Sequence, residues 1–449
     1  MKKKMLFVLA FAGAIASADA QQKVKASLEE LFGMADQNSQ QILASVAGAE
    51  ASHAATQSAQ SSRLPDVNLS ISGSYIGTAC VMSRGFSTSG TTTVPYTIGV
   101  GQVENGTQDT PHWGNDFVAQ VTQVLYAGGG ISAGVRLAEL GEQMARLDVE
   151  KTRQEVRFLI TGHYLELSKL NNQLEVVRKN IELTEQVLKD MRLRQEQGTV
   201  LRNDITRYEL QLQSLQLSET QLLGTISIMN HQIVTLLHLP EGTEIETLEM
   251  QEPVDARNHE HWQSRAAEQN LSLQQAQLQS EIRETEVKAV RASKLPSIAL
   301  VAEDHLTGPY VSDLIPVDAN VNAWFIGIGI KYNLGSLWHK NHDESKARLQ
   351  ARQSQEQALL ASEGICNAVQ ADYVNFQTSF VEVDTQRKQV ELATQHYDIT
   401  RNRYDNGLAL LTDMVDASNM KLSAELTLVN AQINLIYNYY KLKYITSSL

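Results

Sequence analysis

Two aspartates, Asp413 and Asp416, lie three positions apart in a stretch with helical periodicity, so both carboxylates should face the same side of a helix. Carboxylates held close together favour cations and titrate as a coupled set. The ordinary alternative is that Asp413 caps its helix by accepting hydrogen bonds from free N–H groups of the first turn. Both interpretations stay open at this level.

The spacing around these residues occurs twice in the chain. The pattern R-x-R-x-x-x-G-x-x-x-x-x-D spans 192–204 and again 401–413, so that Asp204 corresponds to Asp413. Each copy follows a Ser-basic-Leu-Pro step, at 62–65 and at 293–296. The sequence is therefore an internal duplication.

Other arrangements that could do chemistry are weak. His259 and His261 flank Glu260, but no third metal ligand stands in register with them, and a solvated pair is the favoured interpretation. The remaining histidines are scattered, and neither a Ser-His-Asp arrangement nor a phosphate-binding G-x-x-x-x-G-K-[ST] loop can be argued. The sequence predicts no enzyme activity, no cofactor and no resident metal.

Helical periodicity dominates the elements that carry these residues. Apolar residues step by three and four, as in the seams of coiled coils, through four stretches: 167–191, 205–236, 383–404 and 415–440. We expect two antiparallel helical hairpins, one over 130–238 with its tip at Gly198 and one over 342–446 with its tip at Gly407.

Shorter helices are expected over 27–62 and 257–294, each stacked end to end with the shorter arm of a hairpin. The segment 240–256 contains Pro240 and Pro253 and cannot continue a helix. We expect it to form a linker at mid-height. It separates a first repeat, 21–239, from a second repeat, 257–449.

Alternating apolar and polar residues predict four strands of about 10 residues each, the length of a tilted transmembrane β-strand. They are 66–79, 115–126, 297–307 and 321–333. In the last strand, Trp324, Ile326, Ile328 and Ile330 form one apolar face, and small or polar residues form the other. That alternation is typical of an outer-membrane barrel whose apolar face contacts lipid.

Four strands cannot close a barrel, because the smallest membrane barrels need about eight. Open strand edges in lipid would leave backbone groups unpaired, at several kcal/mol each. The chain is therefore expected to form a homotrimer, which supplies twelve strands and twelve helical strands. The alternative is a non-channel periplasmic coiled-coil scaffold, which would be soluble and either monomeric or bundled.

The N-terminal residues 1–20 have the basic, apolar and A-x-A regions of a secretory signal peptide, so the mature chain should begin near Gln21. The formal net charge is −13, which argues against nucleic acid as a partner. Two cysteines, Cys80 and Cys366, exclude a disulfide scaffold. No later segment is long and apolar enough to be a transmembrane helix.

These features resemble the TolC-like outer membrane efflux protein family. The resemblance rests on the duplicated halves, the Leu-Tyr-Ala-Gly-Gly step at 125–129, the Arg-x-Arg-Tyr-x-x-Gly turn at 401–407 and the string Asp-Met-Val-Asp-Ala at 413–417. It implies a mixed α/β membrane protein, in which a trimeric 12-stranded transmembrane β-barrel continues into a 12-helix periplasmic α-barrel.

The resemblance also implies a function. Such proteins are passive exit ducts in the outer membrane of Gram-negative bacteria, and they receive drugs or metabolites from an inner-membrane pump through a periplasmic adaptor protein. A protein-secretion (type I) duct of the same fold stays open as an alternative, since the tunnel wall is generic. Neighbouring genes for the pump would separate the two.

The closed periplasmic end of this family uses a tyrosine three residues before the second turn glycine, a basic residue two after it, and aspartates six and nine after it. Tyr404, Asp413 and Asp416 match, as does Asp204 on the first hairpin, but Ala409 stands where the basic residue is expected. The tyrosine-to-aspartate link can therefore form, whereas the charged link lacks its partner. Tyr404 is equally well explained as an ordinary seam residue.

Threefold symmetry would bring Asp413 and Asp416 into two rings of carboxylates at the narrowest point, where divalent cations would block the channel. At the tips, Gly198 and Gly407 should have positive φ, as any hairpin turn favours. A functional interpretation adds Thr199 and Leu408 to these glycines as contacts for the adaptor protein.

From the proline step to the turn glycine the first copy is 22 residues longer than the second (133 positions against 111), and the extra residues fall in the Gly-, Ser- and Thr-rich segment 79–111. We expect it to form an extracellular loop at the mouth of the barrel. It would either narrow the pore or be flexible and unspecialised, and the second interpretation is favoured.

Overall fold

The computed structural model describes most of the chain in seven ranges: 23–77, 79–81, 106–108, 111–248, 250–253, 258–311 and 316–449. The signal peptide expected at 1–20 lies outside these residues. The chain divides into two compact units. Unit 1 comprises Met1–Ser52, Glu142–Ser280 and Ser354–Leu449, and unit 2 comprises His53–Gly141 and Glu281–Gln353.

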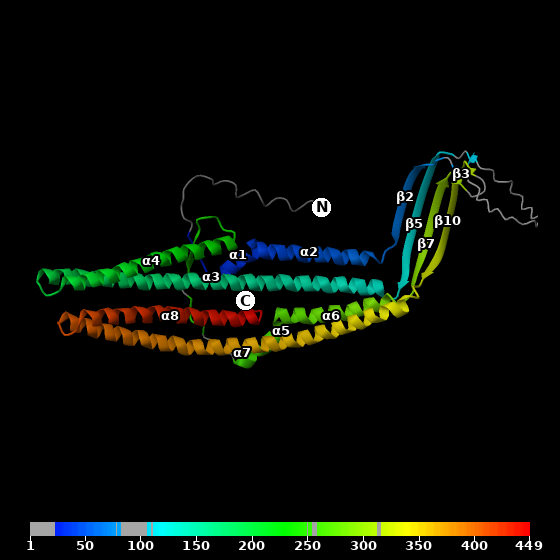
Figure 1. Cartoon of the computed structure of the whole chain (residues 1–449). Helices are drawn as coiled ribbons and strands as arrows, with labels where there is room; N and C mark the ends of the chain where they lie inside the picture. Colours follow the sequence, from blue (N-terminus) through cyan, green and yellow to red (C-terminus); the bar gives the residue numbers. More distant parts are fainter. Residues whose placement is uncertain are drawn as a thin grey trace, which may run out of the picture. The chain divides into compact units, whose positions relative to one another are not determined.

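Eight helices lie in the described ranges. They are α1 (Leu28–Asn38), α2 (Gln40–Ser61), α3 (Gly130–Glu196), α4 (Arg202–Leu236), α5 (His259–Gln269), α6 (Leu271–Ala292), α7 (Ser336–Asp405) and α8 (Leu411–Ile445). The pairs α3–α4 and α7–α8 form the two helical hairpins that the heptad periodicity predicts (Figure 1). Their returning arms are of equal length, 35 residues each, as expected of an internal duplication.

The second hairpin begins earlier than the predicted residue 342, because α7 starts at Ser336. Asn333 closes the turn before it: its carbonyl accepts from the Ser336 N–H, and its side-chain oxygen accepts from the Gly335 N–H. A tight turn of this kind lets the helix start a few residues after the preceding strand.

The prediction of continuous helices over 27–62 and 257–294 is wrong, since each segment is two helices. Ser39 and Asn270 separate them, with extended backbone at ψ 121° and 118°. Asn270 accepts a hydrogen bond from the Leu273 N–H and so caps α6, while its amide donates to the carbonyl of Ile445. A break of one residue does not disturb the apolar periodicity, so the sequence pattern did not indicate it. The break nevertheless occurs at corresponding positions of the two copies, Ser39 and Asn270.

One core of unit 1 lies where α1 and the start of α2 pack against α3 and the end of α4. Its members are buried apolar residues from all four helices, including Leu31, Ile42, Ile160 and Ile233. This contact supports the predicted stacking of a short helix on the short arm of the hairpin. In the second copy, α5 packs against α7 and α8 around the fully buried Trp262.

The predicted linker at 240–256 contains a strand, β6 (Glu244–Thr247), which pairs in parallel with β1 (Lys23–Ala26). The hydroxyl of Tyr164 on α3 holds both segments. It donates to the carbonyl of Ala26 at 3.1 Å and accepts from the N–H of Leu248 at 2.7 Å. Neither the strand β1 nor the parallel pairing was predicted from the sequence.

The four predicted strands form one antiparallel sheet in unit 2, in the order β10-β7-β5-β2 (Figure 1). Their bounds are β2 (Asp66–Tyr75), β5 (Trp113–Ala127), β7 (Ser297–Gly308) and β10 (Val321–Lys331). Within the segment 79–111, expected to be a loop, β3 (Ala79–Val81) pairs with β4 (Gly106–Gln108). Most of the rest of that segment lies outside the described residues. A similar short pair, β8 (Tyr310–Val311) and β9 (Pro316–Val317), follows β7.

The two faces of the sheet differ in chemistry. On β10 the apolar side chains of Trp324, Ile326, Ile328 and Ile330 are 67–72% exposed. The opposite face carries polar groups, among them His305, whose Nε2 lies 2.5 Å from the Asp116 carboxylate on the neighbouring strand. Strands β10 and β2 are the two edges. The single chain thus leaves an apolar sheet face uncovered and two strand edges unpaired.

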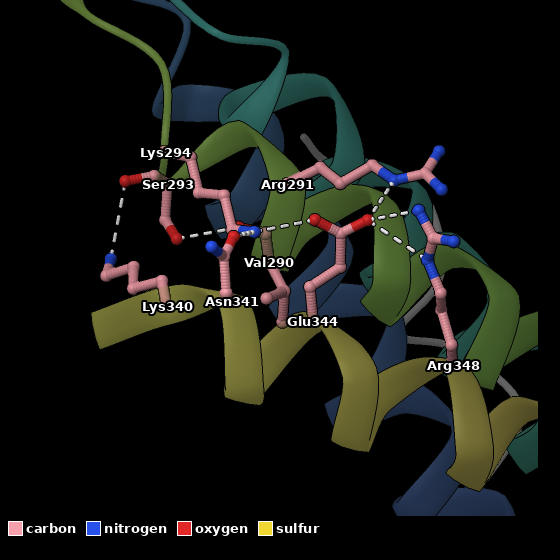
Figure 2. A network of polar contacts seen from close by, with 8 residues as sticks. All are labelled: Val290, Arg291, Ser293, Lys294, Lys340, Asn341, Glu344 and Arg348. Atoms are coloured by element: carbon pink, nitrogen blue, oxygen red, sulfur yellow. Dashed lines mark hydrogen bonds and ion pairs between the residues drawn. The ribbon is translucent and has the colours of Figure 1, made fainter. Parts of the chain in front are cut away.

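A polar network joins α6 and α7 beside this sheet, where α6 leads into β7 and β10 leads into α7 (Figure 2). Glu344 accepts hydrogen bonds from Lys294 at 2.8 Å and from Arg291 at 2.8 Å, and it also pairs with Arg348 on its own helix. These three cations lower the pKa of Glu344 to about 2. The network ties together the two helices that carry the central and edge strands.

Candidate functional site

Both hairpin turns close in the same way. Gly198 and Gly407 have φ of +76° and +71°, which confirms the predicted left-handed backbone. After Gly198 the N–H of Thr199 donates to the carbonyl of Arg194, and after Gly407 the N–H of Leu408 donates to that of Arg403. The N–H groups of Gly198 and Gly407 donate to the carbonyls three residues earlier, those of Gln195 and Tyr404. These two bonds define the Schellman motif, which satisfies the last carbonyls of each helix.

An apolar cluster next to the two turns packs the ends of the hairpins against each other. It contains buried residues of α3, α4 and α8, and Tyr404 of α7 packs against it at half burial. Its buried members are Val187, Leu188, Met191, Ile205, Tyr208, Leu411, Met414 and Val415. Burial raises the pKa of the Tyr208 hydroxyl above its ordinary value.

Two polar contacts cross between the hairpins near the tips. Arg194 of α3 pairs with Asp405 of α7, with Nη2 and Oδ1 3.0 Å apart. Gln211 of α4 donates to Asn419 of α8 at 2.7 Å. Asp405 also lies 4.0 Å from Arg401 on its own helix. The two tips of one chain are thus connected by charge as well as by apolar packing.

The duplicated arginines have different partners. Arg403, the counterpart of Arg194, donates to the carbonyl of Leu408 in its own turn. Arg192, the counterpart of Arg401, pairs with Glu209 inside the first hairpin at 2.8 Å. Equivalent sequence positions therefore make non-equivalent contacts, because the two hairpins pack on each other with different faces.

Asp413 and Asp416 are both exposed and lie in the first turns of α8. Asp413 accepts a hydrogen bond from the N–H of Leu410 at 3.1 Å, so the capping interpretation has a direct contact. Among the described residues Asp416 has no hydrogen-bond or ion-pair partner. Its carboxylate is therefore available to a second chain or to a cation.

Tyr404 and Asp204 are close but not hydrogen-bonded to each other within the described ranges. Burial raises the pKa of Tyr404, and the negative charge of Asp204 raises it further. The position of Tyr404 against the apolar cluster fits the seam interpretation. The structure thus brings this tyrosine and aspartate together without forming the link that the family resemblance suggests.

The outermost residues of the tips are exposed, and several are apolar. Leu201, Leu408 and Leu410 are 69–72% exposed. The hydroxyl of Thr199 donates to the Arg194 carbonyl, which makes it part of the turn. Each tip therefore presents exposed apolar side chains.

Metal binding receives no support. In the part of the chain that the structure describes, no three His, Cys, Asp or Glu side chains gather as a metal site. His259 packs edge-on against Tyr373, with ring centroids 5.3 Å apart, and His261 packs against Trp262.

Of the described helices, none is apolar over a stretch sufficient to cross a membrane.

Comparison with known proteins shows the family. A family model described as outer membrane efflux protein matches residues 31–237 and 262–446. The chain belongs to the outer membrane efflux protein family. It is 22% identical over 189 residues to the outer membrane protein TolC of Salmonella enteritidis, a match that covers 41% of this chain and 38% of TolC.

Solved structures of similar fold extend over nearly the whole chain. The outer membrane protein VceC of Vibrio cholerae superimposes with a TM-score of 0.77 at 17% identity, over 94% of this chain and 96% of VceC. The CmeC outer membrane channel of Campylobacter jejuni gives 0.74 at 14% identity, over 94% and 85%. At these identities the likeness establishes a TolC-like channel fold.

Membership of the outer membrane efflux protein family confirms the predicted location in the outer membrane with extension into the periplasm. It also confirms the prediction that the protein is a channel rather than an enzyme. The predicted tip residues, by contrast, stay predictions. The ion pair between Arg194 and Asp405 was not predicted, because it joins two different hairpins and the repeated spacing within each hairpin does not indicate contacts between them.

Proposed function

We propose that three copies of this efflux protein assemble into a 12-stranded outer-membrane barrel that continues into a 12-helix periplasmic tunnel. The observation that carries the proposal is the four-stranded sheet with one exposed apolar face and two open edges. In lipid the apolar face is stable, but open edges cost several kcal/mol for each unpaired backbone group. Pairing β2 of one chain with β10 of the next removes both edges.

The duct is passive and serves as the last part of a tripartite system. Its cargo is small molecules that an inner-membrane pump delivers through a periplasmic adaptor protein. The adaptor contacts the tips at Gly198, Thr199, Gly407 and Leu408, together with the exposed Leu201 and Leu410. Apolar side chains that are this exposed in a water-filled compartment favour a protein partner.

The tips also form the gate. In the trimer, the exposed Asp416 and Asp413 carboxylates lie in rings that attract cations, and Tyr404 and Asp204 lie at the contact between hairpins. The basic residue that the family uses is replaced by Ala409. Arg194 supplies a charged link in its place, through Asp405 and within one chain.

The test uses the full chain, purified in detergent and inserted into a planar bilayer. Light scattering should give the mass of three chains, and the bilayer should show discrete conductance steps. A monomeric protein that dissolves without detergent and gives no conductance would support the coiled-coil scaffold and end the proposal.

A further inference from the structure

An aromatic groove lies in unit 1 between α3 and α8, away from the hairpin tips. It has a volume of about 380 Å³, and Gln41 at the start of α2 also lines it. Its walls are Phe158, Tyr437 and Tyr444 together with Glu155 and His163. The volume is in the range of small-molecule sites.

The aromatic rings form a continuous surface. Phe158 stacks on Tyr444 with ring centroids 4.5 Å apart and an interplanar angle of 14°, and Tyr437 lies 5.7 Å from Phe158. All three rings are half-buried, and all three line the groove, although Phe158 and Tyr444 cover one face of each other. Aromatic faces carry negative electrostatic potential and attract cations.

The charge at the groove has one sign. Glu155 forms no hydrogen bond or ion pair with any other residue of the described ranges. Burial raises the pKa of the Tyr444 hydroxyl, and the negative charge of Glu155 raises it by a smaller amount. Of the described residues that line the groove, His163 alone is basic, and burial lowers its pKa. At neutral pH the groove therefore has a carboxylate and no cation of its own.

This face of α3 differs from the face that packs in the core with α1. Val156, Ile160 and Tyr164 are buried in the core with α1, whereas Glu155 and Phe158 fall on another side of the same helix. Phe158 and the carboxylate of Glu155 thus lie outside that core, whereas Tyr437 packs at the edge of a second cluster formed by Leu165, Ile433 and Ile436.

We propose that this groove binds a monovalent organic cation with an apolar body. The rings accommodate the apolar body and the delocalised charge, and Glu155 supplies the counter-charge. A single carboxylate does not make a metal site, an anion would be repelled, and a neutral compound would leave the carboxylate unpaired. The further statement that such cations are cargo in contact with the duct wall rests on the proposed function.

The test measures binding of tetraphenylphosphonium to the full chain in neutral detergent by equilibrium dialysis, with tetraphenylborate as an anion of matched size. We expect saturable binding of one phosphonium per chain and no saturable binding of the borate. Glu155→Gln should weaken phosphonium binding about tenfold, and Phe158→Leu should weaken it severalfold. Glu182→Gln, an exposed glutamate of the same helix, should leave it unchanged.

Equal binding of both ions, or unchanged phosphonium binding in Glu155→Gln, would overturn the proposal. A second copy of the chain is the competing occupant. If a second copy occupies the groove, phosphonium should not bind, and chains with Leu159→Cys at the groove should form a disulfide with each other. That result would also overturn the proposal. Bilayer conductance of the same preparation separates the two proposals, because normal conductance without binding refutes this inference alone.

Discussion

Arg194 on the first hairpin and Asp405 on the second form an ion pair of 3.0 Å between residues 211 positions apart. Both side chains are more than a third exposed, so one such pair stabilises the contact by only about 0.5 kcal/mol. In the proposed trimer, three such pairs would act together on the proposed opening step.

Arg194→Ala or Asp405→Ala should therefore favour the open channel. Loss of three links worth about 0.5 kcal/mol each changes the ratio of open to closed states about tenfold. Single-channel recording measures this ratio. Arg192→Ala, which removes a pair within one hairpin, is the matched control. The reversed pair Arg194→Asp with Asp405→Arg should restore closure, and a failure of both single variants to alter open time would exclude a role in gating.

Charge and capping can be separated at the two aspartates. Asp413→Asn keeps an oxygen that can accept from the Leu410 N–H, whereas Asp413→Ala removes it and should cost about 1 kcal/mol of unfolding free energy. Asp416→Asn should leave stability unchanged. The double Asn variant should lose block by divalent cations in bilayer recordings. Block of normal strength in that variant would assign the aspartates to helix capping alone.

The turn glycines should resist substitution for a reason independent of packing. A Cβ at Gly198 or Gly407 would meet no atom within 4 Å, but both residues have positive φ. Alanine should therefore cost about 1 kcal/mol at each position through backbone strain. Gly224, inside α4 and equally open, is the control, where alanine should stabilise by about 0.5–1 kcal/mol. Denaturant midpoints measure all three. Equal effects at the three sites would contradict the argument.

Acid should weaken the α6–α7 connection through Glu344. Its pKa is about 2 in the folded protein against an ordinary value of 4.5, so its contribution to stability is complete above pH 4.5 and is lost as pH falls toward 2. Glu344→Gln should be less stable than the natural chain at pH 7, and the difference should vanish near pH 2. Glu356→Gln, at an exposed position of the same helix, is the matched control. Urea unfolding at a series of pH values provides the comparison.

The sheet faces should differ in their tolerance of charge. Ile328→Lys places a cation on the exposed apolar face and should cost about 2–4 kcal/mol of stability in lipid if the position is near the midplane. Gly329→Lys places it on the opposite face and should be tolerated, since Lys331 lies on that face already. Heat stability of the reconstituted protein distinguishes them. Equal loss in both variants would mean that the Ile328 face does not contact lipid.

Local patterns were sufficient for the two helical hairpins, the four long strands and their order along the chain. Apolar periods of three and four predict α3, α4, α7 and α8, strict alternation predicts the four strands, and the glycines at 198 and 407 mark the turns. These signals can be read from neighbouring residues alone, because helix faces, strand faces and left-handed turns depend on short-range geometry. The duplication strengthened each prediction by repeating it.

The tertiary structure decided what distant residues do to one another. The cap at Asn270, the parallel pairing of β1 with β6, and the ion pair of Arg194 with Asp405 all depend on partners far away in the chain. The same is true of the groove that Phe158 and Tyr444 share. No periodicity encodes such partners, since each contact exists only once helices with separate patterns have packed against each other.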